Sequence, residues 1–131
     1  MISNNNASKK NTLFSQRVKK LAATATLVMA LLILYLAFSP QAMQASIGIN
    51  DKIIHFVAFA ALILPCAIFL VRSLIWILPL TLFFGGTIEI LQPGFERVAT
   101  WADFHADAFG LAAGVVLGLV LRAILKSKYH L

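Results

Sequence analysis

Long apolar runs separated by short polar segments dominate this chain. Four runs approach the length of about 20 mostly apolar residues that a helix needs to cross a bilayer, and they cover residues 21–38, 53–71, 74–91 and 104–125. The segments between the runs are too short to form another domain. The pattern therefore predicts an all-α, integral membrane four-helix bundle over residues 21–125, with a basic tail at residues 1–20 and a short tail at residues 126–131.

Composition agrees with this pattern. Hydrophobic residues make up 60% of the 131 residues and charged residues only 12%, whereas soluble proteins are about half apolar and about a quarter charged. The first apolar run follows a basic segment, as in a secretory leader. It is 18 residues long, however, and leaders usually have an apolar run of about 7–15 residues, so we expect an uncleaved spanning helix.

The interiors of two spans contain residues that bear on helix shape and packing. Pro65 and Pro79 lie inside the second and third runs. Each lacks a backbone N–H and is expected to kink its helix. The single cysteine, Cys66, also lies in the second run, which predicts a small packing residue and no internal disulfide.

The fourth run has glycines at four-residue spacing, Gly110, Gly114 and Gly118, called here the glycine ridge. A repeated G-x-x-x-G pattern lets another helix approach closely. We expect the ridge to pack within the bundle, and the third run is the first choice of partner because Gly85 and Gly86 offer a small surface there. The same ridge could also join two copies of the chain in a homo-oligomer.

The basic residues predict the orientation of the bundle. With four spans, one side of the membrane holds nine of the 11 basic residues, and the other side holds only Lys52 and Arg97. Basic residues accumulate on the cytoplasmic side, so both termini should be cytoplasmic (N-in/C-in). Because the net charge of +6 belongs to segments that flank spans, we do not expect the protein to bind nucleic acid.

All the carboxylates fall at or near the opposite, outer side. They are Asp51, Glu89, Glu96, Asp103 and Asp107. Ionisable groups inside a bilayer are costly and usually face the bundle interior. Asp51 and His55 share one helix face because they are four residues apart, and Asp103 and Asp107 share a face for the same reason. Glu89 likewise lies three residues before Gln92. Three helix ends could thus direct polar side chains into one shallow cavity.

Structural roles for these acids stay open. Asn50 or Asp51 could cap the second span, and Thr100 with Asp103 fits a capping box at the start of the fourth. Glu89 is different, because the dipole at the C-terminal end of its own helix disfavours an anion. It needs hydrogen bonds or a cation, and a purely structural ion pair would satisfy it.

These motifs, in this order, resemble the VanZ-like family of small bacterial membrane proteins. The matching residues are Asp51, Lys52 and His55 (D-K-x-x-H), Glu89 and Gln92 (E-x-x-Q), and Arg97, Asp103, Gly110 and Gly114. Asp107 departs from a common Asn, and Thr100 from a frequent Ser. The resemblance covers about half the chain and implies the bacterial inner membrane, a function at the cell envelope and an effect on glycopeptide susceptibility, but no defined reaction.

Three functions are compatible with the sequence. The first is binding of a membrane lipid or a lipid-linked envelope precursor by its polar head group, and the expected binding residues are Asp51, Lys52, His55, Glu89, Gln92, Arg97, Asp103 and Asp107. The second is an intramembrane enzyme with Glu89 or Asp107 as general base and His55 as acid. The third is a proton- or cation-coupled carrier, for which polar residues would have to continue deeper into the bilayer.

We expect neither a cofactor nor a metal ion. His55, Glu89, Asp103 and Asp107 are acceptable ligand types for zinc or manganese, but their spacing is not diagnostic. Lys52 and Arg97 would also repel a cation.

The basic-residue asymmetry generates a testable topology, with residues 39–52 and 92–103 outside. Cysteines introduced at positions 44 and 95 should react with a membrane-impermeant thiol reagent from the outer side, because both positions follow spans that end there. Cysteine-accessibility labelling measures this. Labelling of either position from the cytoplasmic side alone would contradict the proposed orientation.

Overall fold

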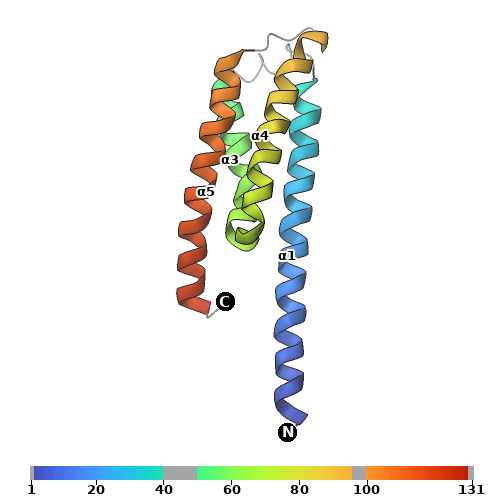
Figure 1. Ribbon diagram of the computed structural model, residues 1–131, viewed down its shortest axis with the longest axis vertical. Helices are drawn as coiled ribbons and strands as arrows, with labels where there is room; N and C mark the ends of the chain where they lie inside the picture. The colour runs from blue at the N-terminus through green and yellow to red at the C-terminus, as the bar shows by residue number, and fades with distance from the viewer. Residues whose placement is uncertain (1, 40–49, 96–99, 130–131) are drawn as a thin grey trace.

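A computed structural model shows a bundle of helices (Figure 1) and describes residues 2–39, 50–95 and 100–129, with side chains from residue 15 onward. The described part contains helices and no strand. The helices are α1 (Ile2–Ala37), α3 (Asp51–Phe69), α4 (Leu74–Leu91) and α5 (Trp101–Tyr129), with short 3-10 turns at Val71–Ser73 and Gln92–Phe95.

Four of these segments are long and apolar enough to cross a membrane. They are Ser15–Ala37, Asp51–Phe69, Val71–Phe95 and Trp101–Lys128. The predicted multi-pass, all-helical fold is therefore confirmed, and α4 has the predicted bounds of 74–91. Both chain ends lie towards the same end of the bundle (Figure 1). Pro65 and Pro79 lie inside α3 and α4, and the kinks stay predictions, as does the N-in/C-in orientation.

The first helix is longer than predicted. The segment expected to be a mobile tail, residues 1–20, is helical from Ile2 as part of α1, which has 36 residues. No glycine or proline interrupts these residues, and Lys, Arg, Gln, Leu and Ala favour helix. Once the apolar half of α1 is helical, each further residue adds a hydrogen bond at little extra cost.

The glycine ridge packs against α3, and the expected partner, α4, was wrong. A Cβ at Gly110 would collide with the carbonyl oxygen of Phe56, and a Cβ at Gly114 would lie 2.5 Å from that of Ala60. At Gly118 the obstacle would be the Cβ of Ala67. The partner face of α3 thus presents mainly backbone and alanine, together with Cγ2 of Ile63 opposite Gly114, and the ridge lets the helices approach closely. A homo-oligomer through the ridge stays a prediction, and it would require the ridge to leave α3.

The predicted partner surface on α4 has another use. A Cβ at Gly85 would lie only 2.9 Å from Oδ2 of Asp107 and 3.2 Å from the ring of Phe59. Gly85 therefore makes room for a carboxylate of α5 and an aromatic ring of α3. Gly86 has looser surroundings, since a Cβ there would lie 3.6 Å from the ring of Phe104.

The apolar core lies between α1, α3 and the ends of α4. Phe59, Leu62, Ile63 and Cys66 of α3 are almost completely buried, and the hydroxyl of Thr26 on α1 lies 3.1 Å from the Sγ of Cys66. Cys66 is therefore a packing residue, as expected. Large apolar side chains elsewhere are exposed on all four helices, as a lipid-facing bundle surface requires.

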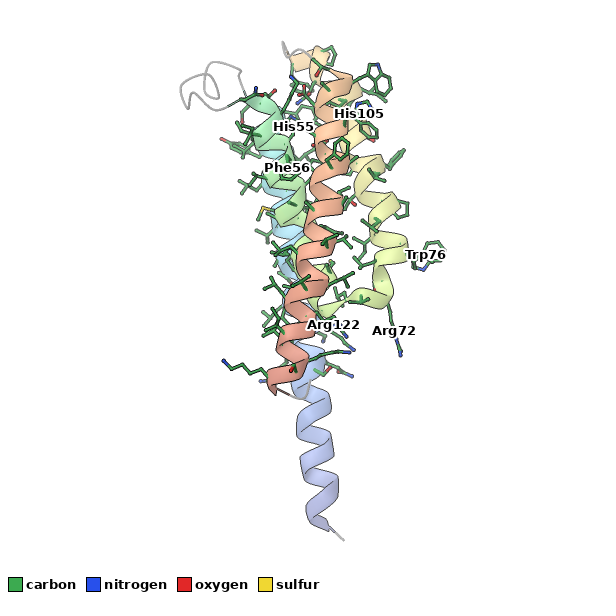
Figure 2. All side chains as sticks on the ribbon, turned by 90° about the vertical axis from the view of Figure 1, so that its left-hand side faces the viewer. His55, Phe56, Arg72, Trp76, His105 and Arg122 are labelled. Carbon is green, nitrogen blue, oxygen red and sulfur yellow. The ribbon has the colours of Figure 1, made fainter. Side chains whose placement is uncertain are left out.

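The two ends of the bundle differ in chemistry. At one end, called here the polar end, α3 and α5 begin while α1 and α4 end (Figure 1). Figure 2 shows His55 and His105 near this end, with Arg72, Trp76 and Arg122 towards the other. Arg122 donates a hydrogen bond to the carbonyl of Ile68 over 2.5 Å and so satisfies the last turn of α3. Trp76 is exposed at the start of α4, where an interfacial ring belongs.

The ridge generates a packing prediction. Gly114→Leu should destabilise the detergent-solubilised protein by more than about 3 kcal/mol, because the new side chain meets α3 backbone and cannot be absorbed by a rotamer change. Thermal or denaturant unfolding of the purified protein measures the loss. Ala113→Leu is the matched control, since Ala113 is exposed one residue earlier, and it should be nearly neutral. Equal stability of the two variants would show that the ridge faces lipid.

Candidate functional site

Side chains from three helices meet at the polar end. The Nδ1 atom of His55 on α3 lies 2.9 Å from Oδ1 of Asp107 on α5 and 3.9 Å from Oε1 of Glu89 on α4. One ligand atom from each of these residues lies within 4.8 Å of the other two. Asp103, one turn before Asp107, is also buried. We call these four residues the buried polar cluster.

The close approach of α3 and α5 positions the cluster. Asp107 lies three residues before Gly110, at the end of the ridge where the α5 backbone touches Phe56. His55 precedes Phe56 on α3, so its ring meets the Asp107 carboxylate across the same contact. The absent side chain at Gly85 leaves space for that carboxylate on the α4 side. The expected shallow cavity is therefore a buried site, because the glycines bring the helices too close to leave it open.

Glu89 caps a neighbouring helix. Its Oε2 accepts a hydrogen bond from the backbone N–H of Thr100, over 3.1 Å, just before α5 begins. Glu89 is poorly placed with respect to its own helix, α4, whose C-terminal dipole disfavours an anion. The structure shows that a carboxylate at the end of α4 lies against the positive N-terminal end of α5, which favours an anion.

Thr100 and Asp103 form the predicted capping contact. The N–H of Asp103 donates to Oγ1 of Thr100 over 3.3 Å, and that hydroxyl donates to Oδ2 of Asp103 over 2.7 Å. In a complete capping box the acid would accept from the N–H of Thr100. Here Glu89 takes that N–H, so two carboxylates share the first turn of α5.

Three carboxylate oxygens of the cluster are buried without a hydrogen-bond partner among the described residues: Oε1 of Glu89, Oδ1 of Asp103 and Oδ2 of Asp107. Buried polar atoms are nearly always paired, and leaving one unpaired costs about 1–3 kcal/mol, or more when charged. The cluster therefore has capacity for a further proton, water or cation.

The other predicted site residues lie outside the cluster. Asn50 caps α3 by accepting the N–H of Lys52 over 3.0 Å, and Asp51 lies partly buried in the first turn. The Lys52 side chain is 53% exposed, with its Nζ 4.0 Å from Oδ1 of Asp103. Gln92 is buried and donates to the carbonyl of Ala37 over 3.4 Å, so it ties α4 to the end of α1. Arg97 and Glu96 lie outside the described residues.

An open groove of about 620 Å³ runs between α3 and α5 at the polar end. Its lining residues are Asn50, Lys52, Ile53, Phe56, Ala102, His105, Ala106 and Phe109. Asp107 and Phe109 are two residues apart and thus about 200° apart around α5, so the groove and the cluster lie on different sides of that helix. Of its lining residues, only Lys52 was predicted from the sequence to bind a ligand, and Asn50 was expected only as a possible cap of the second span. The three- and four-residue spacing along each helix was the available signal.

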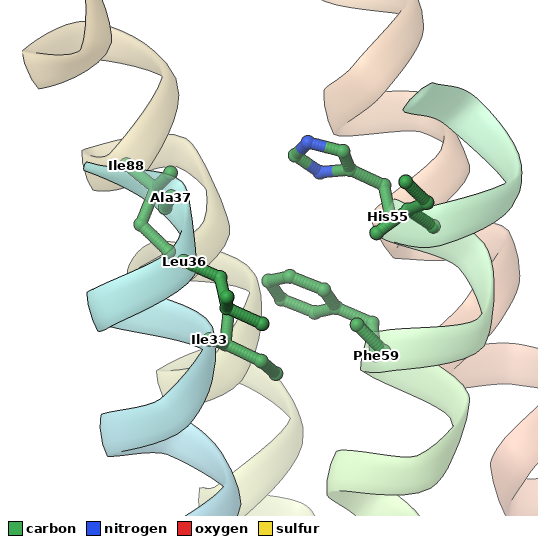
Figure 3. A pocket seen from close by; sticks show the side chains of 8 residues that line it. Ile33, Leu36, Ala37, His55, Phe59 and Ile88 are labelled. Carbon is green, nitrogen blue, oxygen red and sulfur yellow. The ribbon is translucent and has the colours of Figure 1, made fainter. Parts of the chain in front are cut away.

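A second, smaller cavity of about 40 Å³ adjoins the cluster on the side of α1. In Figure 3 the rings of His55 and Phe59 point from α3 into this cavity, towards Ala37 and Ile88. Its volume exceeds the 10–15 Å³ or so that a water molecule needs, but the lining offers few polar partners apart from His55. The imidazole therefore has room on the α1 side.

Comparisons with known proteins leave the family open, because no protein-family model, no curated protein and no solved structure matches the chain. The resemblance to the VanZ-like family therefore stays a prediction that rests on the motifs alone.

The His55–Asp107 contact predicts energetic coupling. In a double-mutant cycle with His55→Ala and Asp107→Ala, the stability changes should deviate from additivity by about 1–3 kcal/mol, because the two side chains share one buried hydrogen bond. Denaturant unfolding in detergent measures each variant.

The control is a second double-mutant cycle that uses His105 in place of His55. His105 is an exposed histidine on the same helix as Asp107. His105→Ala and Asp107→Ala should be additive within about 0.5 kcal/mol. Additivity in both cycles would show that His55 and Asp107 do not interact in the purified protein.

Proposed function

We propose that the protein binds the phosphate-bearing head group of an envelope amphiphile at the outer face of the bacterial inner membrane, in the groove between α3 and α5. The observation that carries the proposal is the chemistry of the groove lining. The lining combines a lysine, an asparagine and a histidine with two phenylalanines and an isoleucine. A lipid head group and the start of its chain present the same combination.

The helix termini beside the groove support an anionic ligand. Asn50 and Lys52 belong to the start of α3, and Ala102 belongs to the first turn of α5. Two helix N-termini therefore flank the groove, and their backbone dipoles favour negative charge. Lys52 adds a full positive charge that is half exposed and free to reach a phosphate.

The acids were predicted to line the head-group site, and we propose an indirect role for them instead. Asp103 is buried beneath Lys52, and the distance of 4.0 Å between Oδ1 and Nζ lets the carboxylate hold the ammonium near the groove. Glu89 and Asp107 belong to the cluster on the other side of α5, so the head-group site uses them only indirectly.

Two elements of the resemblance to the VanZ-like family, the D-K-x-x-H motif and Asp103, lie in the first turns of α3 and α5. They support a role at the cell envelope, and with it an effect on glycopeptide susceptibility through a lipid-linked precursor. The outer location follows from the basic-residue asymmetry.

An intramembrane acid–base enzyme is the second candidate. The 2.9 Å contact between His55 Nδ1 and Asp107 Oδ1 favours it, because a carboxylate that orients an imidazole is a common arrangement for proton transfer. A carrier has less support. Below His55, the α3 residues Phe59, Leu62 and Ile63 are fully buried and apolar, so the polar path stops at the cluster.

Native mass spectrometry of the purified protein tests the head-group site. A polyprenyl phosphate should be retained and the matching polyprenol should not, because only the phosphate can pair with Lys52. Lys52→Ala and His105→Ala should each weaken retention by about 10-fold, since a hydrogen bond to a charged group contributes about 1.5 kcal/mol or more. Phosphatidylglycerol, in a parallel arm, separates a lipid-linked precursor from an ordinary anionic lipid.

Lys126→Ala is the matched control, because Lys126 is an exposed lysine in the last turn of α5. It should retain the phosphate like the wild type. Equal retention by all three variants, or equal retention of phosphate and alcohol, would refute binding in the groove.

A further inference from the structure

The buried polar cluster holds more negative charge than its described neighbours neutralise. The Asp107 side chain is 1% exposed and that of Glu89 is 10% exposed, and each has an oxygen without a hydrogen-bond partner. A buried carboxylate must take up a proton, meet a donor or meet a cation. In a lipid-surrounded bundle this requirement is stricter, because bulk water cannot reach the buried atoms.

Lysine and arginine do not meet this requirement within the described part of the chain. The ammonium of Lys52 lies 4.0 Å from Asp103 and is half exposed on the groove side. The ion-pair partner that Glu89 and Asp107 share is His55, whose Nδ1 is already held at 2.9 Å by Asp107. Even when it is protonated, the imidazole brings one positive charge to two carboxylates, and the same nitrogen, Nδ1, is the one placed near both of them.

The geometry of the cluster suits a metal ion. Metal–ligand bonds of about 2.0–2.2 Å place neighbouring ligand atoms roughly 3–3.5 Å apart. His55 Nδ1 lies 2.9 Å from Asp107 Oδ1 and 3.9 Å from Glu89 Oε1. One ligand atom from each of the three residues lies within 4.8 Å of the other two. Side-chain movements of a few tenths of an ångström to about one ångström would bring the three ligand atoms within bonding distance of one ion.

We propose that His55, Glu89 and Asp107 bind one divalent first-row metal ion, zinc or manganese. One imidazole nitrogen and two carboxylate oxygens are suitable donors for either ion. The ion takes the place of the shared proton between His55 and Asp107 and gives the unpartnered Glu89 oxygen a positive partner. Three protein ligands leave at least one coordination position for water or an anion. The site is separate from the α3–α5 groove and does not rest on lipid binding there.

From the sequence, Lys52 and Arg97 were expected to repel a metal ion. The Lys52 ammonium, however, is associated with Asp103 on the groove side of the cluster, and Arg97 lies outside the described residues. The preference between zinc and manganese depends on the coordination number, which the open positions leave adjustable.

Metal content of the full-length protein in detergent tests the proposal. After treatment with a chelator and dialysis against Mn²⁺ or Zn²⁺, elemental mass spectrometry should find about one equivalent per chain of at least one of these ions. That ion should raise the melting temperature. Asp107→Asn, Glu89→Gln and His55→Gln should each weaken binding by more than about 10-fold, whereas Lys126→Gln, in the exposed last turn of α5, should bind like the wild type.

Two results would overturn the proposal. One is wild-type protein that takes up neither ion, in which case protons hold the carboxylates. The other is unchanged uptake by Asp107→Asn and Glu89→Gln. If the cluster variants do not fold, pulsed electron paramagnetic resonance of Mn²⁺ bound to the wild type still tests the site. An imidazole ligand must produce a coupling between the Mn²⁺ electron spin and the ¹⁴N nucleus of the coordinating nitrogen. Bound manganese without that coupling excludes His55 as a ligand and refutes the site.

Discussion

Contact between the backbones of α3 and α5 is the constraint on which the rest of the bundle depends. Gly110 and Gly114 carry no side chain, and a Cβ at either position would meet a carbonyl oxygen of α3. The two helices therefore lie closer than larger residues would permit, and His55 comes within hydrogen-bond distance of Asp107. The remaining helices attach to this pair: α1 through its contact with the core face of α3, and α4 through the space that Gly85 leaves beside Asp107.

Several polar side chains, Glu89 of the cluster among them, bind backbone groups at the ends of helices. Gln92 donates to a carbonyl in the last turn of α1, Arg122 donates to one in the last turn of α3, and Glu89 accepts the first free amide of α5. Unpaired backbone groups at helix ends are expensive in a bilayer, where water reaches them poorly. Each of these bonds joins one helix to another, so satisfying the backbone also fixes how the helices are arranged.

The sequence predicted those features that a single helix determines. Run length located the four spans, and glycine spacing identified the smooth face of α5. The partner of that face was predicted wrongly, because α3 and α4 both contain small residues and spacing within one helix does not select between them. Glu89 was assigned by the dipole of its own helix, whereas the amide that it accepts belongs to another. The open groove was missed for the same reason, since it exists only where the registers of α3 and α5 coincide.

The length of α1 has a mechanical consequence. It runs without interruption for 36 residues, or about 54 Å at 1.5 Å per residue, and Figure 1 shows it extending well past the other helices. Only Ser15–Ala37, 23 of its 36 residues, is apolar enough to lie in the membrane. Because no hinge separates the two parts, a small tilt of the apolar part becomes a larger sideways displacement of the free end. A molecule that binds the basic free end would therefore change how α1 packs against α3 whenever it displaces that end.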